Sequence, residues 1–332
     1  MCYIRRIIHS PPSTDMKAIR YHGTYRKTDS RAELKTSHGK PVACIIGAGS
    51  IGQLTAELLR RRGLFKTCFI DTRIKKPKRV ACTCSSINGR SSYRCAKGVY
   101  PESFVRYADL LIITVKAFSV AKIIRDIAPH LKHDTPVVLM VNGFGAQEEL
   151  KKLTHENRLY LASTSNGATH KKYSVVEKGL GTTYIGPLKH AKEISVIKYF
   201  TKSMPSGTYT ASIYDELLRK LAVNAVINPV TAIRNCVNAE ILNDPDIIRE
   251  IITEISPILR HLGLNDSPDS LMHRVETVAA NTGANYSSMQ QDYYYGRLSE
   301  IDYILGILIK KARIYGIKTP CIDKLYQQLK NM

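Results

Sequence analysis

Residues 42–52 read Val-Ala-Cys-Ile-Ile-Gly-Ala-Gly-Ser-Ile-Gly, and this stretch decides the fold. Its first five residues are apolar, which predicts a buried strand, and residues 53–62 after it have the pattern of a helix. A G-x-G-x-x-G turn between strand and helix allows a tight bend, close backbone approach to a pyrophosphate and close helix–strand packing. The helix start also offers unpaired N–H groups to phosphates. The sequence therefore predicts a dinucleotide-binding turn made of Gly47, Ala48, Gly49, Ser50, Ile51 and Gly52.

The end of the next predicted strand, residues 67–70, carries signals for two different cofactors. Asp71 lies about twenty residues past the glycines, where an acid commonly bonds the adenosine ribose of NAD. Arg73 follows two residues later, and its guanidinium suits the 2′-phosphate of NADP. We predict NADPH as the cofactor, and Asp71 keeps NADH open as the alternative.

Further strands alternate with helices, which favours a doubly wound parallel sheet. Residues 80–107 show no regular pattern and are predicted to be irregular. Lys116 and Asn142 directly follow two of the strands, at the carboxyl edge where such sheets bind ligands. Loop solvation or turn chemistry would explain either residue alone. The other predicted elements here are strands at 110–115, 136–141, 159–165 and 182–185 and a helix at 119–131.

From about residue 210 the apolar spacing is helical to the end of the chain. The predicted fold class is therefore α/β, with the sheet in residues 41–208 and an all-helical domain in residues 209–332. Pro229 is expected to end or kink the first helix of that domain and to bias Asn228 away from helical geometry. The predicted helices are 211–228, 244–262, 268–280 and 299–315.

The first of these helices carries three polar residues in an otherwise apolar segment. Lys220, Asn224 and Asn228 are four residues apart, so a helix places them on one face. A buried helix whose amides bond neighbouring backbone is one interpretation of this stripe. The polar lining of a binding site is the other.

Two more polar clusters lie in the helical half. Asn285 and Ser288 are three residues apart and would share a face if helical, and Ser299 and Glu300 open an apolar helix. Capping and helix-dipole complementarity would explain Ser299 and Glu300 without any function. Each cluster taken singly is therefore compatible with a structural role.

The composition is that of a globular chain, since 44% of its 332 residues are hydrophobic. No apolar run reaches the roughly 18 residues that a membrane span needs. The net charge of +21 is dispersed, and only residues 21–27 interleave aromatic with basic residues, so most of this charge is expected to be solvated surface. Binding to a nucleic acid is the minority interpretation. Residues 1–40 are expected to be a disordered leader or a misassigned start, with Met16 as a second initiator.

The eight cysteines do not have the spacing of a metal site. Cys82, Cys84 and Cys95 lie close together in sequence, but neither C-x-x-C pairs nor regularly spaced histidines accompany them. We expect reduced cysteines, as in a cytoplasmic protein, and no bound metal.

Together, these stretches resemble the ketopantoate reductase (2-dehydropantoate 2-reductase) family of NADPH-dependent oxidoreductases. The resemblance runs from Val42 to the C-terminus and implies an N-terminal Rossmann-type domain followed by a helical one. It departs from the family where Asp71 replaces an arginine that commonly binds the 2′-phosphate. The stretches that carry it are residues 47–52, 114–117, 141–145, 219–229, 285–288 and 300–303.

The resemblance also implies a role for each matching position. Lys220 matches the proton donor, and Glu300 matches an acid that faces both the substrate hydroxyl and the cofactor. Cofactor contacts are implied for Lys116, Asn142 and Ala168, together with Arg73 by its proximity to Asp71. Substrate contacts are implied for Asn142, Lys220, Asn224, Asn228, Asn238, Asn285 and Ser288.

The implied reaction is reduction of 2-dehydropantoate to pantoate in pantothenate synthesis, in the cytoplasm, with a small 2-oxo acid as the partner. A related reductase of another 2-oxo acid or diketone is the first alternative. A nucleotide-sensing or polyanion-binding protein without turnover is the second, although such a protein needs no proton donor. The sequence leaves the oligomeric state open, with a homodimer among the possibilities.

Overall fold

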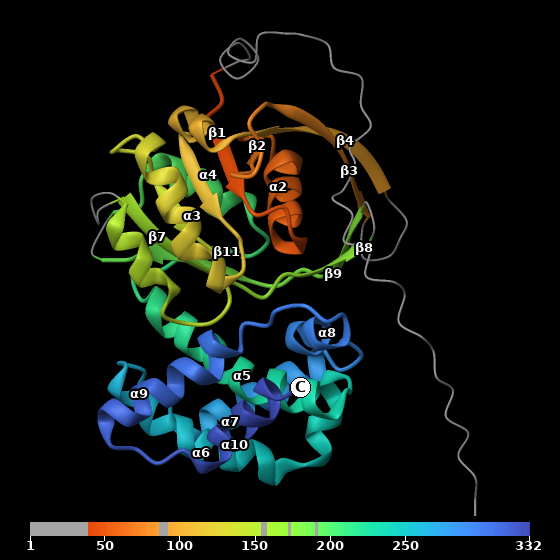
Figure 1. Cartoon of the computed structure of the whole chain (residues 1–332), viewed down its shortest axis with the longest axis vertical. Coiled ribbons are helices and arrows are strands. Elements are labelled where there is room, and N and C mark those ends of the chain that lie inside the picture. Colours follow the sequence, from red (N-terminus) through yellow and green to blue (C-terminus); the bar gives the residue numbers. More distant parts are fainter. Residues whose placement is uncertain (1–38, 86–91, 154–157, 172–173, 190–191) are drawn as a thin grey trace, which may run out of the picture.

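The computed structural model describes residues 39–85, 92–153, 158–171, 174–189 and 192–332, and these form two lobes (Figure 1). The upper lobe is built on a sheet and the lower one consists of helices, as the sequence predicts. The expected leader, residues 1–40, falls outside the described residues except for its last two positions.

Parallel strands form the centre of the sheet lobe, because their sequences are apolar enough to be covered on both faces. Strand β1 (Val42–Ile46) pairs with β2 (Lys66–Ile70) on one side and with β5 (Leu110–Ile113) on the other. Strands β6 (Val137–Leu139) and β7 (Leu159–Thr164) continue the sheet beyond β5. Helices α2 (Ser50–Arg62) and α4 (Ser195–Ser203) pack into one buried cluster, and α3 (Val120–Ile127) packs into the cluster on the opposite face. The predicted doubly wound parallel sheet is confirmed.

The expectation of irregular structure in residues 80–107 is wrong. Strand β3 (Lys78–Ser85) pairs with β4 (Ser92–Tyr100) as an antiparallel hairpin, and a 3₁₀ helix (Glu102–Tyr107) follows. A second hairpin, β8 (Gly167–Lys171) and β9 (Ser174–Gly179), adds to β3. These strands curve around α2 (Figure 1). Their small and charged residues give little alternation, so the pairing within each hairpin and with β2 and β9 leaves no clear local pattern.

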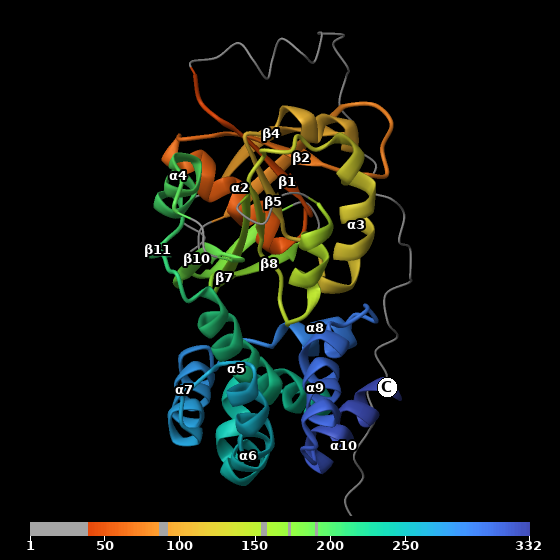
Figure 2. The same ribbon diagram turned by 90° about the vertical axis from the view of Figure 1, so that its left-hand side faces the viewer.

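Strand β10 (Thr183–Pro187) pairs antiparallel with β7, and β11 (Gly207–Tyr209) pairs parallel with β10 at that edge of the sheet. The complete strand order is β11-β10-β7-β6-β5-β1-β2-β4-β3-β9-β8. The helical lobe begins soon afterwards with α5 (Ile213–Arg234), which Figure 2 shows entering that lobe beside α6 and α7.

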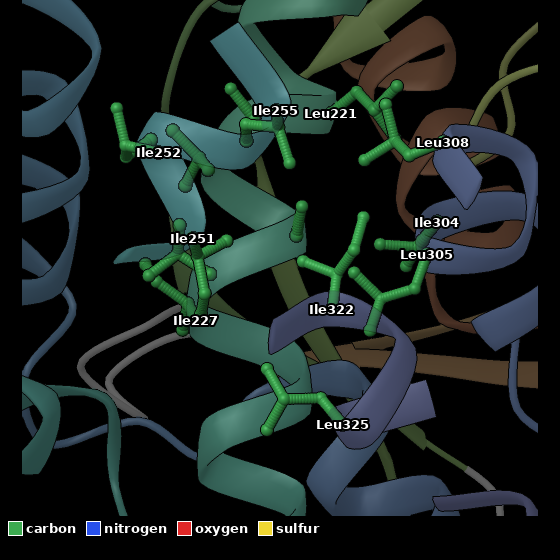
Figure 3. Packing of buried hydrophobic residues seen from close by; sticks show 14 of the residues in the cluster. Leu221, Ile227, Ile251, Ile252, Ile255, Ile304, Leu305, Leu308, Ile322 and Leu325 are labelled. Atoms are coloured by element: carbon green, nitrogen blue, oxygen red, sulfur yellow. The ribbon is translucent and has the colours of Figure 1, made fainter. Parts of the chain in front are cut away.

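The helical lobe has one apolar core, to which almost every one of its helices contributes. Leu221 and Ile227 of α5 meet isoleucines of α6 and leucines of the C-terminal helices there (Figure 3). No helix in the described part of the chain is both long and apolar enough to span a membrane. The elements after α5 are a 3₁₀ helix (Asn238–Asn243), α6 (Pro245–His261), α7 (Pro268–Asn281), α8 (Ser288–Tyr294), a π-helical turn (Asp302–Gly306), α9 (Ile307–Tyr315) and α10 (Pro320–Lys330).

Pro229 does not end α5, contrary to one of the two expectations for it. The helix continues to Arg234 and ends at Asn235, whose φ of 51° is the left-handed cap conformation. Thr231, two residues after the proline, donates its hydroxyl to the Ile227 carbonyl at 2.7 Å and so satisfies a backbone acceptor near the proline. Burial of the surrounding segment in the core then outweighs the hydrogen bond that proline removes.

Candidate active site

The glycine turn after β1 packs closely against its neighbours. Gly47 has a φ of 109°, and a Cβ there would lie 2.8 Å from the carbonyl carbon of Thr114. A Cβ on Gly52 would lie 1.8 Å from the Gly47 oxygen, so α2 could not approach the strand with any other residue. The Thr114 hydroxyl donates to that same Gly47 oxygen at 2.9 Å. Two of the three glycines are therefore required by the fold itself.

Gly49 has a different environment. A Cβ there would meet no atom of the described chain within 4 Å, and Gly49 is the N-cap of α2. All residues of α2 are described, and none in its first turn is acidic. The amide groups at this helix start thus lie beside open space without a carboxylate to neutralise their partial positive charge. This arrangement fits the pyrophosphate of a dinucleotide.

Asp71 and Arg73, the two residues that signal different cofactors, form one ion pair beyond β2. Arg73 Nε donates to Asp71 Oδ1 at 2.9 Å and Nη2 donates to Oδ2 at 3.1 Å. Partial burial acts to raise the pKa of Asp71, but hydrogen bonds from Arg73 outweigh it and lower that pKa. The Arg73 side chain is 85% exposed. The acid suited to a ribose and the cation suited to a phosphate therefore occupy the same place.

Lys220 of α5 lies at the junction of the two lobes. Its Nζ donates to the carbonyl oxygen of Thr164, the last residue of β7, at 2.8 Å. The residue is partly buried, and protein atoms surround its ammonium. This desolvation lowers the pKa of Lys220 to about 8, against the opposing effect of the Glu300 charge. An amine with a lowered pKa thus lies at the carboxyl edge of the sheet.

Glu300 connects the helical lobe with two strand ends of the sheet lobe. One oxygen, Oε1, accepts a hydrogen bond from the backbone N–H of Ala117 at 2.8 Å. The other, Oε2, lies 3.4 Å from both Lys116 Nζ and Asn142 Nδ2. Glu300 is only 4% exposed. Three residues that the sequence analysis singles out, 116, 142 and 300, therefore meet in one place.

Asp292 belongs to the same cluster and was missed by the sequence analysis. It lies on α8, is 4% exposed, and accepts a hydrogen bond from Lys116 Nζ at 2.7 Å. No local pattern marks it, because Lys116 is 176 residues away in the chain. The Thr164 carbonyl that accepts the hydrogen bond from Lys220 was also missed, since a backbone atom leaves no signature in the sequence.

The loop after β6 docks onto the π-helical turn that follows Glu300. The backbone N–H of Phe144 donates to the Tyr303 carbonyl at 2.8 Å, and a Cβ on Gly143 would lie 2.5 Å from that oxygen. The Phe144 ring packs into the core of the helical lobe. A π-helical turn disturbs the regular backbone bonding of a helix, which frees a carbonyl for such a contact. This docking brings Asn142 next to Glu300.

The remaining amides of α5 lie on the same helix as Lys220. Asn224 is partly buried and Asn228 is 5% exposed. Neither side chain has a hydrogen bond to any described residue, which contrasts with the interpretation that they bond neighbouring backbone. Two amides in a largely buried setting are thus available to a ligand.

Asn238 and Asn285 also lie together, since the Asn238 N–H donates to the Asn285 carbonyl at 2.9 Å. The Asn238 amide nitrogen donates to Thr282, whereas its buried Oδ1 has no partner among the described residues. Asn285 and Ser288 do not share a helix face, because Ser287 caps α8 and the helix begins at the exposed Ser288. Ala168 lies apart from this group, in β8 against the core that includes α2.

No group of His, Cys, Asp and Glu side chains within the described residues could hold a metal ion. The side chains of Cys82, Cys84 and Cys95 are outside that description. Cys44 and Cys68 are both buried free thiols on paired strands, with their sulfur atoms 3.4 Å apart. The hydrogen bond with Cys68 and burial raise the pKa of Cys44, which disfavours its reactive thiolate form.

Comparison with known proteins gives two consecutive family matches. Residues 43–190 match the model "Ketopantoate reductase PanE/ApbA", and residues 212–332 match "Ketopantoate reductase PanE/ApbA C terminal". The 2-dehydropantoate 2-reductase of Salmonella typhi is 31% identical over 289 residues, which cover 86% of this chain and 93% of the relative. The chain belongs to the ketopantoate reductase family. It is accordingly an oxidoreductase.

A further relative and two solved structures are also similar to this chain. The 2-dehydropantoate 2-reductase of Vibrio cholerae is 35% identical over 231 residues, which cover 68% of this chain and 78% of that protein. The crystal structure of a probable 2-dehydropantoate 2-reductase from Bacillus subtilis is 26% identical and superposes with a TM-score of 0.72, covering 87% of this chain and 99% of that one. D-mandelate dehydrogenase with NADH and anilino(oxo)acetate has a TM-score of 0.77 at 24% identity, covering 87% and 97% of the two chains, and shares the fold.

Proposed function

We propose that this ketopantoate reductase reduces 2-dehydropantoate to pantoate with NADPH, in the cytoplasm. Residues 41–208 would hold the cofactor, and residues 209–332 would supply the proton donor. The relatives from Salmonella typhi and Vibrio cholerae carry the name of this activity. The observation that carries the proposal is Lys220 at the junction of the lobes, with a pKa lowered to about 8.

The residues fit the chemistry that ketone reduction needs. When bound, the dihydronicotinamide supplies a hydride to the ketone carbon. Negative charge then develops on the carbonyl oxygen, and the Lys220 ammonium stabilises that oxygen and transfers its proton there, which leaves the product alcohol and a neutral amine. The Thr164 carbonyl holds the Lys220 Nζ at 2.8 Å before the substrate arrives. General acid catalysis of this kind is typically worth about 100- to 10,000-fold in rate.

The cluster around Glu300 supports a substrate that carries a hydroxyl group. The buried carboxylate accepts one short hydrogen bond, from Ala117, and its other oxygen has only contacts at 3.4 Å. That oxygen can accept a substrate hydroxyl, and an analogue without the hydroxyl would leave it poorly satisfied. Asn224 and Asn228 would bind the 2-oxo acid, with Asn238, Asn285 and Ser288 as further substrate contacts.

The Asp71–Arg73 pair makes NADH a second candidate cofactor. Asp71 occupies the position of a ribose-binding acid, which favours NADH, whereas Arg73 provides a guanidinium for the 2′-phosphate of NADPH. Lys116, Asn142 and Ala168 would contact either dinucleotide. A relative from Staphylococcus aureus is described as a dimeric ketopantoate reductase, which supports a homodimer as the assembly to test.

Oxidation of NADPH and of NADH by the purified chain, followed at 340 nm, tests the proposal. We expect turnover with 2-dehydropantoate, faster with NADPH, and much weaker turnover with 2-oxo acids that lack its hydroxyl. Lys220→Ala should abolish turnover and leave cofactor binding intact. Absence of turnover with both cofactors would refute the assignment as an enzyme, and preference for another 2-oxo acid or a diketone would change the substrate.

A further inference from the structure

Asp292 is a buried carboxylate to which neither cofactor nor substrate binding has been assigned. Its Oδ2 accepts a hydrogen bond from Lys116 Nζ at 2.7 Å, across the junction of the lobes. Its Oδ1 lies 3.3 Å from Nε of Arg297, in the loop that leads from α8 to Glu300. The side chain therefore connects the end of β5 with the segment that carries Glu300.

The Lys116 ammonium lies near two buried carboxylates, those of Asp292 and Glu300. Its ammonium lies 2.7 Å from Asp292 and 3.4 Å from Glu300, so Asp292 holds the closer contact. The shorter hydrogen bond of Glu300, from Ala117, comes from a neutral group. The Lys116 side chain is 38% exposed, whereas Glu300 is 4% exposed, so the buried charge that gains from a partner is that of Glu300. If Asp292 lost its charge, Lys116 would therefore move to Glu300.

We propose that Asp292 is a positioning residue: it holds the Lys116 ammonium so that the negative charge of Glu300 acts on Lys220 and on the substrate hydroxyl. The inference rests on the proposed function, in which Lys220 donates the proton. Loss of the Asp292 charge would let Lys116 pair with Glu300. The negative charge of Glu300 would then stabilise the Lys220 ammonium less.

The charges at this junction give the sign of the effect. The charged groups at the junction are Lys116 after β5, Asp292 on α8, Arg297 in the loop after α8, and Glu300 before the π-helical turn. Strand β7 presents the neutral Thr164 carbonyl to Lys220. The Glu300 charge raises the pKa of Lys220. Neutralising Glu300 therefore makes Lys220 lose its proton at a lower pH than in the parent protein.

Acetylation of Lys220 by acetic anhydride as a function of pH, quantified by mass spectrometry, tests this without substrate. Asp292→Asn should move the midpoint of Lys220 reactivity to lower pH. The same substitution in a Lys116→Met background should move it much less, because no ammonium is left to approach Glu300. Glu57→Gln is the matched control: Glu57 is a buried carboxylate in two arginine contacts on α2, and its loss should leave the midpoint unchanged. An unchanged midpoint in Asp292→Asn, or equal shifts in both backgrounds, would overturn the proposal.

Kinetics separate this inference from the proposed function. Asp292→Asn should lower kcat/KM for 2-dehydropantoate by up to about 100-fold, the scale expected when reacting groups are misplaced by an ångström. Asp292→Glu should recover part of this loss. Suppose that the parent protein turns over no 2-oxo acid, but Asp292→Asn shifts the labelling midpoint of Lys220 more in the parent than in the Lys116→Met background. The proposed function would then fail, and the positioning role of Asp292 would stand. Normal turnover with unmoved midpoints would refute only the positioning role.

Discussion

At the scale of a single residue, the lowered pKa of Lys220 predicts that the lysine proposed as proton donor reduces the stability of the fold. Desolvation of its ammonium lowers the pKa to about 8, although Glu300 acts in the opposite direction. The unfolded chain binds the Lys220 proton with the ordinary lysine pKa of 10.5. Between about pH 8 and 10.5 the unfolded state therefore binds more protons, and the stability contributed by this residue rises with pH. At pH 7 the full penalty of the buried charge is present.

Replacing Lys220 with methionine should therefore raise stability while it abolishes turnover. We expect the melting temperature of Lys220→Met to exceed that of the parent protein at pH 7, and this difference to shrink as pH rises from about 8 to 10.5. Calorimetry at several pH values measures it. Lys122→Met, at a side chain that is 63% exposed, should show no such dependence. A variant less stable than the parent at pH 7 would show that Lys220 contributes mainly structure.

The choice of cofactor is also set at the residue scale. Asp71→Asn removes the charge that holds Arg73, which frees the guanidinium for a 2′-phosphate. We expect the ratio of kcat/KM for NADPH over NADH to rise about tenfold, the equivalent of one charge-assisted hydrogen bond of roughly 1.5 kcal/mol. Steady-state kinetics with both cofactors check this. Arg73→Gln in the same background should reverse the gain, and an unchanged ratio in both variants would mean that the pair does not contact the nucleotide.

At the scale of elements, the sequence predicts a helix or strand well where interactions within a few residues determine it. Strand β1 and helix α2 follow from an apolar run and a glycine turn, both of which act within a few residues. The β3–β4 hairpin was missed because its small and charged residues show no alternating pattern, although its two strands pair along the whole length of β3. The stripe from Lys220 to Asn228 marks a helix face. The hydrogen-bond partner of Lys220 is the backbone carbonyl of Thr164, which the sequence pattern does not reveal. The contact between Lys116 and Asp292 joins two segments that no local pattern relates.

The docking of the β6 loop onto the π-helical turn gives a prediction at this scale. Gly143→Ala should destabilise the protein by about 1–3 kcal/mol more than Gly145→Ala, because it adds overpacking against the Tyr303 carbonyl. Gly145 is the matched control, since its φ of 101° is also positive but its Cβ would meet only the end of the Ile307 side chain, at 3.4 Å. Urea unfolding of both variants gives the difference. Equal losses would mean that backbone strain alone matters.

At the scale of the whole molecule, the turn predicted to bind the cofactor and the lysine proposed as proton donor belong to different lobes. The glycine turn lies in the sheet lobe, and Lys220 and Glu300 lie in the helical lobe. Lys220 and Glu300 contact the sheet lobe through the Thr164 carbonyl and the Ala117 N–H, and Figures 1 and 2 show how the two lobes adjoin. The two activities should therefore be separable by substitution.

Gly49→Ala should fold normally and fail to bind the cofactor. Gly49 has a φ of −74° and open space around it, so a methyl group is tolerated by the protein but occupies the place predicted for the pyrophosphate. We expect the rise in melting temperature with NADPH to disappear in Gly49→Ala and to persist in Lys220→Ala, measured by thermal shift; at 100 times Kd this stabilisation is about 2.7 kcal/mol. Retention of the rise in Gly49→Ala would place the dinucleotide elsewhere.

The contact between Gly143 and Tyr303 has a consequence for how such a chain can diverge. The hydrogen bond there joins one main chain to another, from Phe144 to Tyr303, and no side-chain identity at position 303 enters it. The contact therefore requires the absence of a side chain at 143, and it does not require a matched pair of side chains. We therefore expect side chains elsewhere in the helical lobe to be replaceable without loss of the contact that fixes the β6 loop against it.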